Sequence, residues 1–139
     1  MPGEQDEVRW RGVRPVEGIR GVWPERNATR IQEAGARTSS GGENFYTVPA
    51  NKKLFISSLV LTSKLTLAAE VYSTMSVLNA VDVTQYTILR QIYTIAGQQT
   101  LPLSFMPALE VLAGWKVRIY SSSDNLFVFV YIFGWIEDE

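Results

Sequence analysis

The chain has 139 residues, 46% of them apolar, and a formal net charge of −1, which is enough for one hydrophobic core and an appendage. It contains no cysteine and no histidine, which excludes disulfides, thiolate and imidazole catalysis, and Cys/His zinc sites. A near-neutral charge provides no positive field for nucleic acid, and no polybasic or signal-type segment indicates a membrane. We therefore expect no cofactor, no nucleic-acid partner and no membrane attachment.

Residues 1–44 differ sharply in composition from the rest of the chain. They hold seven of the ten glycines, seven arginines and seven acidic residues, but few aliphatic side chains. Such a segment buries too little apolar surface to offset the entropy of ordering it. We expect an extended, irregular N-terminal arm over 1–44, joined through the flexible stretch 39–42 to a domain over 45–139.

A short repeat marks this arm, because Arg-Gly-Val-Arg-Pro at 11–15 recurs as Arg-Gly-Val-Trp-Pro at 20–24. Each copy combines a guanidinium group, a glycine, an aliphatic anchor and a proline that favours extended backbone. Tryptophan is scarce in disordered tails and common at binding hot spots. The segment is therefore predicted to bind protein, through Trp10, Arg11, Val13, Pro15, Arg20, Val22, Trp23 and Pro24.

Two other interpretations of the arm remain open. It can be a disordered tail whose repeat arose by chance. It can also stack single-stranded nucleic acid on Trp10 among its neighbouring arginines. Acidic residues nearby, including Glu7 and Glu17, neutralise that patch, so a protein-binding arm is preferred.

From residue 45 onward, short runs rich in β-branched and aromatic residues alternate with Gly, Pro, Asn, Asp and Ser, which is typical of strands and turns. Helix competes over 65–81 and 108–113, where Ala, Leu, Glu and Met are frequent. Strands are favoured by the alternation of Trp115, Val117 and Ile119 with Lys116, Arg118 and Tyr120, and turn signals lie at 49–51, 96–98, 113–114 and 121–125. We predict an all-β fold, an antiparallel β-sandwich or jelly roll of about eight strands. The strands are expected at 45–48, 53–62, 67–74, 76–81, 86–95, 100–105, 109–112 with 115–121, and 126–135.

The run 126–136 has no polar residue alternating with its apolar ones, so both faces of this strand should be covered. One face can pack inside the sandwich. The other needs another subunit, another layer or the arm, unless the strand is central and covered within its own chain. The candidates for an oligomer interface are Phe127, Phe129, Tyr131 and Phe133.

No motif for catalysis stands out. The sequence has no phosphate-binding loop, dinucleotide turn or hydrolase nucleophile elbow. Before the acidic C-terminus, the acids of 45–139 are scattered, at Glu70, Asp82, Glu110 and Asp124. Asp82 or Asp124 can ligate calcium through oxygen, but turn chemistry explains them more simply. We expect neither an enzyme nor a metal site.

Three segments resemble small β-sandwich proteins of tailed bacteriophages: Val-Pro-Ala-Asn-Lys at 48–52, Leu-Ser-Phe-Met-Pro at 103–107 and Ala-Gly-Trp-Lys-Val at 113–117. In those proteins a Val-Pro-Ala-Gly-Lys turn opens the first long strand. Asn51 replaces that glycine here, which left-handed turn geometry tolerates. The resemblance covers most of 45–139 and none of the arm.

Within that group the chain looks most like a jelly-roll capsid decoration, or cement, protein. The resemblance implies a structural virion protein on the outer capsid surface, a homotrimer that binds the major capsid protein and grips neighbouring copies through its arm. The alternative is a tail or fibre component that binds a receptor or glycan in host adhesion. A small glycan-active enzyme would require two carboxylates facing each other in a cleft.

Overall fold

A computed structural model describes residues 24–25 and 28–139, and within these ranges the chain is all-β, with eight strands and no helix. The strands are rich in β-branched and aromatic residues, and Gly, Pro, Asn, Asp or Ser occur in most of the connections between them. Their bounds are β2 Thr29–Arg37, β3 Gly41–Thr47, β4 Lys52–Leu65, β5 Val71–Leu78, β6 Thr84–Tyr93, β7 Gly97–Val111, β8 Lys116–Ser121 and β9 Leu126–Asp138.

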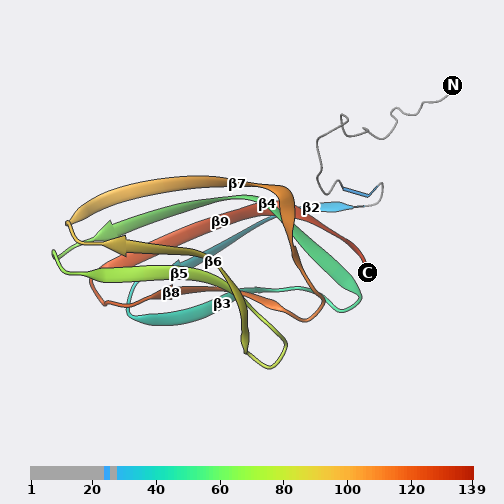
Figure 1. Cartoon of the computed structure of the whole chain (residues 1–139), viewed down its shortest axis with the longest axis horizontal. Helices are drawn as coiled ribbons and strands as arrows, with labels where there is room; N and C mark the ends of the chain where they lie inside the picture. The colour runs from blue at the N-terminus through green and yellow to red at the C-terminus, as the bar shows by residue number, and fades with distance from the viewer. Residues whose placement is uncertain (1–23, 26–27) are drawn as a thin grey trace, which may run out of the picture.

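The strands form two antiparallel sheets of four, in the orders β2-β9-β4-β7 and β3-β8-β5-β6. The chain crosses from one sheet to the other after every strand except β5, which continues into its neighbour β6. This is the strand order of a jelly roll, so the predicted sandwich is confirmed. In Figure 1 the sheet that contains β7, β4 and β9 lies above the sheet that contains β5, β8 and β3.

The core lies between the two sheets and is built from alternate residues of the central strands. On β8 the inward side chains Val117 and Ile119 are fully buried, while their neighbours Lys116, Arg118 and Tyr120 point outward. The period of two that the sequence shows over 115–120 is therefore the core pattern. Facing residues on β4, β5 and β9 complete one continuous apolar cluster.

The turns follow the local chemistry that the sequence indicates. Asn51 has a φ of 63° and Asp82 a φ of 66°, a left-handed conformation that Asn and Asp adopt more readily than most residues. Gly97 and Gly114 lie in the predicted turns at 96–98 and 113–114, with φ of 142° and 79°. The two segments in which a helix was the alternative to a strand, 65–81 and 108–113, contain no helix. Residues 71–78 form β5 and residues 108–111 end β7, because burial between two sheets outweighs helical propensity.

The expected boundary between residues 44 and 45 does not coincide with a break in the structure. Residues 29–37 are β2, which pairs with β9 along its whole length, and residues 41–44 belong to β3, which pairs with β8. Ser39 and Ser40 form the tight connection between β2 and β3, with Arg37 donating hydrogen bonds to Ser39. Residues 29–44 therefore belong to the sandwich, and cross-strand pairing supplies the order that their own composition does not.

Candidate functional site

The outward surface of the β2-β9-β4-β7 sheet carries the aromatic side chains of β9. Along β9 the inward residues Leu126, Val128, Val130 and Ile132 are fully buried. The intervening residues face away from the core, so β9 does alternate, with aromatic rather than polar residues on its outer side. These outward residues are Phe127, Phe129, Tyr131 and Phe133.

Strand register places small or uncharged residues beside these aromatic rings. Three neighbouring cross-strand rows make up what we call the β9 outer face: Ala34, Tyr131, Val60 and Pro102; Ala36, Phe129, Thr62 and Thr100; and Gln32, Phe133, Ser58 and Ser104. None of these residues is charged. The sequence indicated the β9 residues, but the other members required the register, because they lie up to 101 positions away in the chain (Gln32 and Phe133).

Two of the four aromatic residues that were predicted to form an oligomer interface are exposed to solvent. Phe129 is 41% exposed and Tyr131 is 47% exposed, while Phe127 and Phe133 are half-buried. Ala34, Gly35 and Ala36 of β2 leave a hollow of about 330 Å³ beside Phe129 and Tyr131. The three rows of the β9 outer face are therefore uncharged, and at their β2 edge lies a hollow whose lining also includes Glu43 of β3.

A larger hollow of about 640 Å³ lies at the end of the sheet where the described chain begins. Its lining includes Pro24, Glu25, Arg30, Phe133 and Trp135. The Glu137 carboxylate accepts hydrogen bonds from the Glu25 backbone N–H and the Trp135 indole N–H, both at 3.1 Å. Residues just after the arm repeat are thus held against the end of β9.

Of the arm residues predicted to bind protein, only Pro24 lies in the described part of the chain. It is exposed at the rim of this larger hollow. The others lie outside the described residues: Trp10, Arg11, Val13, Pro15, Arg20, Val22 and Trp23. The protein-binding role of the arm stays a prediction.

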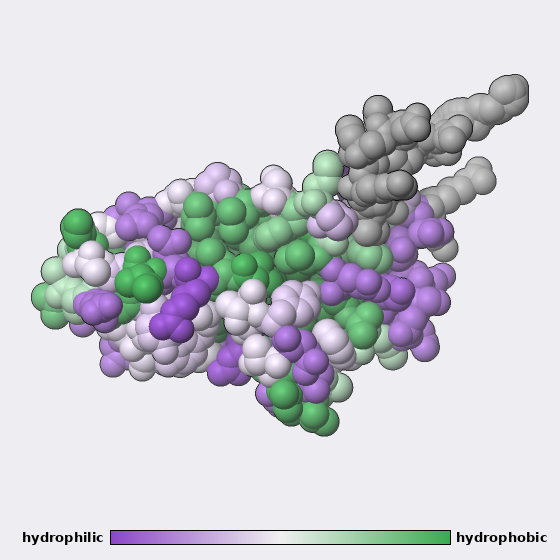
Figure 2. Space-filling view, viewed as in Figure 1, coloured by the Kyte–Doolittle hydropathy of each residue, from purple (hydrophilic) through white to green (hydrophobic). Residues whose placement is uncertain are grey.

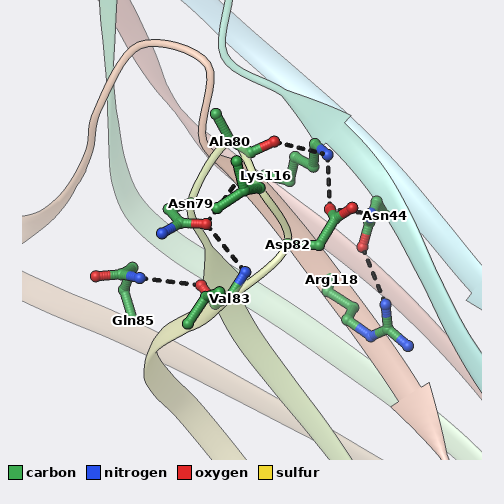
Figure 3. Close-up of polar contacts among 9 residues, drawn as sticks. Asn44, Asn79, Ala80, Asp82, Val83, Gln85, Lys116 and Arg118 are labelled. Atoms are coloured by element: carbon green, nitrogen blue, oxygen red, sulfur yellow. Dashed lines mark hydrogen bonds and ion pairs between the residues drawn. The ribbon is translucent and has the colours of Figure 1, made fainter.

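The carboxylates considered for metal binding have protein partners. Lys116 Nζ donates to Asp82 Oδ1 at 2.6 Å, and this contact lowers the pKa of Asp82 below its ordinary value. Figure 3 shows the ion pair, and in the same β5–β6 turn the Asn79 side-chain oxygen accepts hydrogen bonds from the backbone of Val81 and Val83. The Ser40 backbone N–H donates to Asp124 at 2.9 Å and lowers its pKa.

Glu110, another of the scattered acids, has its carboxylate 3.0 Å from Lys53 Nζ. Burial raises the pKa of Tyr86, whose hydroxyl donates to the Glu110 backbone oxygen at 2.8 Å. Across residues 24–25 and 28–139, no cluster of three or more metal-ligating side chains occurs. The ion pairs and hydrogen bonds of these acidic residues stabilise turns and strand ends.

Among residues 24–25 and 28–139, no helix is long and apolar enough to span a membrane.

No protein-family model and no curated protein matches the chain. Among solved structures, it is similar to a chain of the cyanophage Pam1 capsid asymmetric unit, at 18% identity and a TM-score of 0.44, covering 97% of this chain and 99% of that one. It is similar to the globular domain of zebrafish complement 1qA protein, at 12% identity and a TM-score of 0.40, covering 77% and 96%. A chain of infectious bursal disease virus, Gt strain, is similar over 80% of this chain and 33% of its own, at 8% identity and a TM-score of 0.31. At such values these likenesses carry no functional argument, and the strand order itself establishes the jelly roll.

Proposed function

We propose that the protein is a structural component of a bacteriophage virion, which decorates the outer capsid surface as a homotrimer and stabilises the shell. The β9 outer face carries this proposal. Uncharged aromatic surface of this kind is unfavourable in water and typical of a protein contact. The motif resemblance at 48–52, 103–107 and 113–117 directs the proposal to phage decoration proteins.

The exposed rings are suited to binding another protein. Buried Tyr and Phe side chains contribute large contact areas at little entropic cost, and a few such residues dominate most interfaces. Ala34 and Ala36 leave space beside Phe129 and Tyr131 that a partner side chain can fill. The major capsid protein and neighbouring copies of this chain are the proposed partners of these residues.

The N-terminal arm has a proposed role of its own, which is to grip neighbouring subunits. Its residues 1–23 precede Pro24 in the chain, and Pro24 lines the larger hollow. Fully extended, 23 residues reach on the order of 75 Å, which is enough to cross to an adjacent subunit. The anchors proposed for this grip are Trp10 and Trp23 with the aliphatic and proline residues of the repeat.

Co-sedimentation with capsid shells that lack this protein tests the proposal. The wild-type protein should pellet with the shells and raise the temperature at which they break open. The paired change Phe129→Ala and Tyr131→Ala should weaken this binding at least about tenfold. Leu67→Ala is the matched control, because Leu67 is 61% exposed on the β4–β5 connection, away from the β9 outer face.

Shells that neither bind the protein nor gain stability from it would contradict the decoration role. Equal losses for the paired change and for the Leu67 control would show that the β9 outer face is not the contact surface. Both results are read from the same pelleting assay.

Host adhesion as a tail or fibre component is the second candidate. One observation favours it: Tyr72 and Tyr120 lie side by side on the outer surface of the β3-β8-β5-β6 sheet, with ring centroids 5.8 Å apart, and the Arg90 guanidinium lies 4.1 Å from the Tyr72 ring centroid. Aromatic rings with a nearby cation can stack on sugars. Binding to a glycan array that Tyr120→Ala abolishes would favour this function over decoration.

A further inference from the structure

The sandwich is closed along one edge and open along the other. The backbones of β2 and β3 pack closely, whereas those of β6 and β7, the edge strands of the two sheets at the opposite side, lie farther apart and are bridged by the Tyr86 hydroxyl, which donates to the Glu110 backbone oxygen. We call this β6–β7 edge the open side. Figure 2 shows a band of hydrophobic residues (green) across the middle of the molecule, at the level where Figure 1 draws β7 and β6.

Apolar side chains that belong to the core remain partly accessible along the open side. They pack against fully buried core residues such as Leu59, Met75 and Val77, yet each is only half-buried. These side chains are Tyr86, Ile88 and Leu89 of β6 and Leu101, Leu103 and Phe105 of β7. The core of one chain is thus incomplete at this edge.

The open side also lacks the charges that normally protect a sheet edge. Residues 83–109 contain one charged residue, Arg90. Its guanidinium group lies over Tyr72, on the outer surface of the β3-β8-β5-β6 sheet. Soluble proteins protect exposed edges with charged residues, prolines or a covering element.

Prolines limit what can cover the open side. β7 contains Pro102 and Pro107, and proline has no backbone N–H to donate to an added strand. A partner that docks along β7 therefore packs through side chains, because continuous strand addition is blocked. An uncharged surface of side chains is the complementary partner.

The β9 outer face is such a surface, and every copy of the chain carries one. We infer that the open side of one copy packs onto the β9 outer face of the next copy, in a head-to-tail contact that closes into a ring. This inference rests on the proposed assembly role and specifies its self-contact. When each copy uses its two surfaces on two different neighbours, the contact is heterologous, and it forms a ring where the rotation between copies closes.

The two surfaces are complementary in shape as well as charge. The β9 outer face has its hollow of about 330 Å³ beside Phe129 and Tyr131. On the edge strand β7 of the open side, the apolar side chain of Met106 is 70% exposed. One contact covers both uncharged surfaces, whereas a symmetric edge-to-edge dimer leaves the aromatic rings in water.

Sedimentation velocity of charged variants is the first test. Gln99→Arg places a charge on the open side at an already exposed position, and Leu103→Arg places one among the half-buried residues. Both, like Tyr131→Arg on the other surface, should weaken self-association at least about tenfold. Leu67→Arg is the control and should sediment as wild type. A monomeric wild-type protein, or Gln99→Arg sedimenting as wild type, would overturn the inference.

The second test identifies which surfaces meet, and it uses the absence of native cysteine. Gln99→Cys labels the open side, and Ala34→Cys labels the β9 outer face beside Tyr131, at the opposite edge of the sheet from β7. A short bis-maleimide should cross-link a mixture of the two variants and neither variant alone. Cross-linking of either variant with itself would show a symmetric contact and refute the head-to-tail arrangement, while capsid pelleting would still test the proposed function independently.

Discussion

Phe55 and Trp135 lie opposite each other in the β4–β9 ladder, and their rings stack with centroids 5.2 Å apart and planes 19° from parallel. Trp135 is 7% exposed and also donates its indole N–H to Glu137. The stack joins the start of β4 to the end of β9, at the end of the sheet where the described chain enters. Trp135 is therefore a structural residue, whereas Phe129 and Tyr131 on the same strand are exposed.

Trp135→Ala should destabilise the fold by about 3–5 kcal/mol, the range for removing a large buried aromatic side chain. Chemical denaturation followed by tyrosine and tryptophan fluorescence measures this change. Tyr131→Ala serves as the control, because that ring is 47% exposed and its loss should change the free energy of unfolding by less than about 1 kcal/mol. Similar values for the two variants would disprove the structural role of Trp135.

Gly134→Ala should destabilise the protein because the added Cβ would overlap the backbone carbonyl of Phe55 on β4. Backbone atoms in a paired strand cannot move aside without breaking the ladder, so we expect a loss of at least about 2 kcal/mol. Gly97→Ala isolates the effect of backbone strain, since Gly97 has a φ of 142° and open space around it. A midpoint of thermal unfolding for Gly134→Ala equal to that of wild type would contradict the close approach of β4 and β9.

Truncation separates the arm from the sandwich. Deleting residues 1–23 should leave a folded domain, because β2 to β9 remain intact. This domain should self-associate less tightly and bind capsid less tightly than the full chain. Deleting residues 1–44 should unfold the domain, because it removes β2 and most of β3 and exposes one edge of β9 and of β8. Circular dichroism and thermal unfolding distinguish the two deletion variants. A stable fold after the longer deletion would contradict the pairing of β2 with β9.

Tryptophan anchors should dominate the binding energy of the arm. Trp10→Ala and Trp23→Ala should each weaken assembly more than Arg30→Ala, because aromatic anchors contribute most at interfaces and Arg30 lies exposed on β2. Pelleting with capsid shells at a series of protein concentrations gives the three affinities. Equal small losses for all three variants would remove the anchor role.

Acid should destabilise the fold partly through Asp82 and Asp124. Contacts with Lys116 and Ser40 lower the pKa of the two carboxyl groups in the folded state. Their stabilisation is therefore complete above the unfolded-state pKa of about 3.9 and is lost as the pH falls through the lower folded-state pKa. Asp124→Asn should make the free energy of unfolding fall less steeply between neutral pH and about pH 3 than in wild type, and an unchanged slope would contradict this contribution.

Local sequence was sufficient for the fold class and for the aromatic strand. The alternation of Val117 and Ile119 with Lys116 and Arg118 predicted a half-buried strand, and the structure buries the first pair and leaves the second on the outer surface. A turn at 49–51 was likewise predicted, and Asn51 adopts there a left-handed φ of 63°, which its side chain tolerates. These features depend on residues within a few positions of one another, so local patterns identify them.

Residues 29–44 show where local patterns fail. Their glycines and charges predicted an arm, but β9 and β8 offer edges with which these residues pair, and such partners lie too far along the chain for composition to reveal. The sequence alone determined that β9 has an aromatic side, because that pattern is local. Only the tertiary structure decided which residues of other strands surround this side and which edge of the sandwich stays open. Strand order and register are set by pairing between distant segments, and that pairing positions both surfaces of the proposed contact.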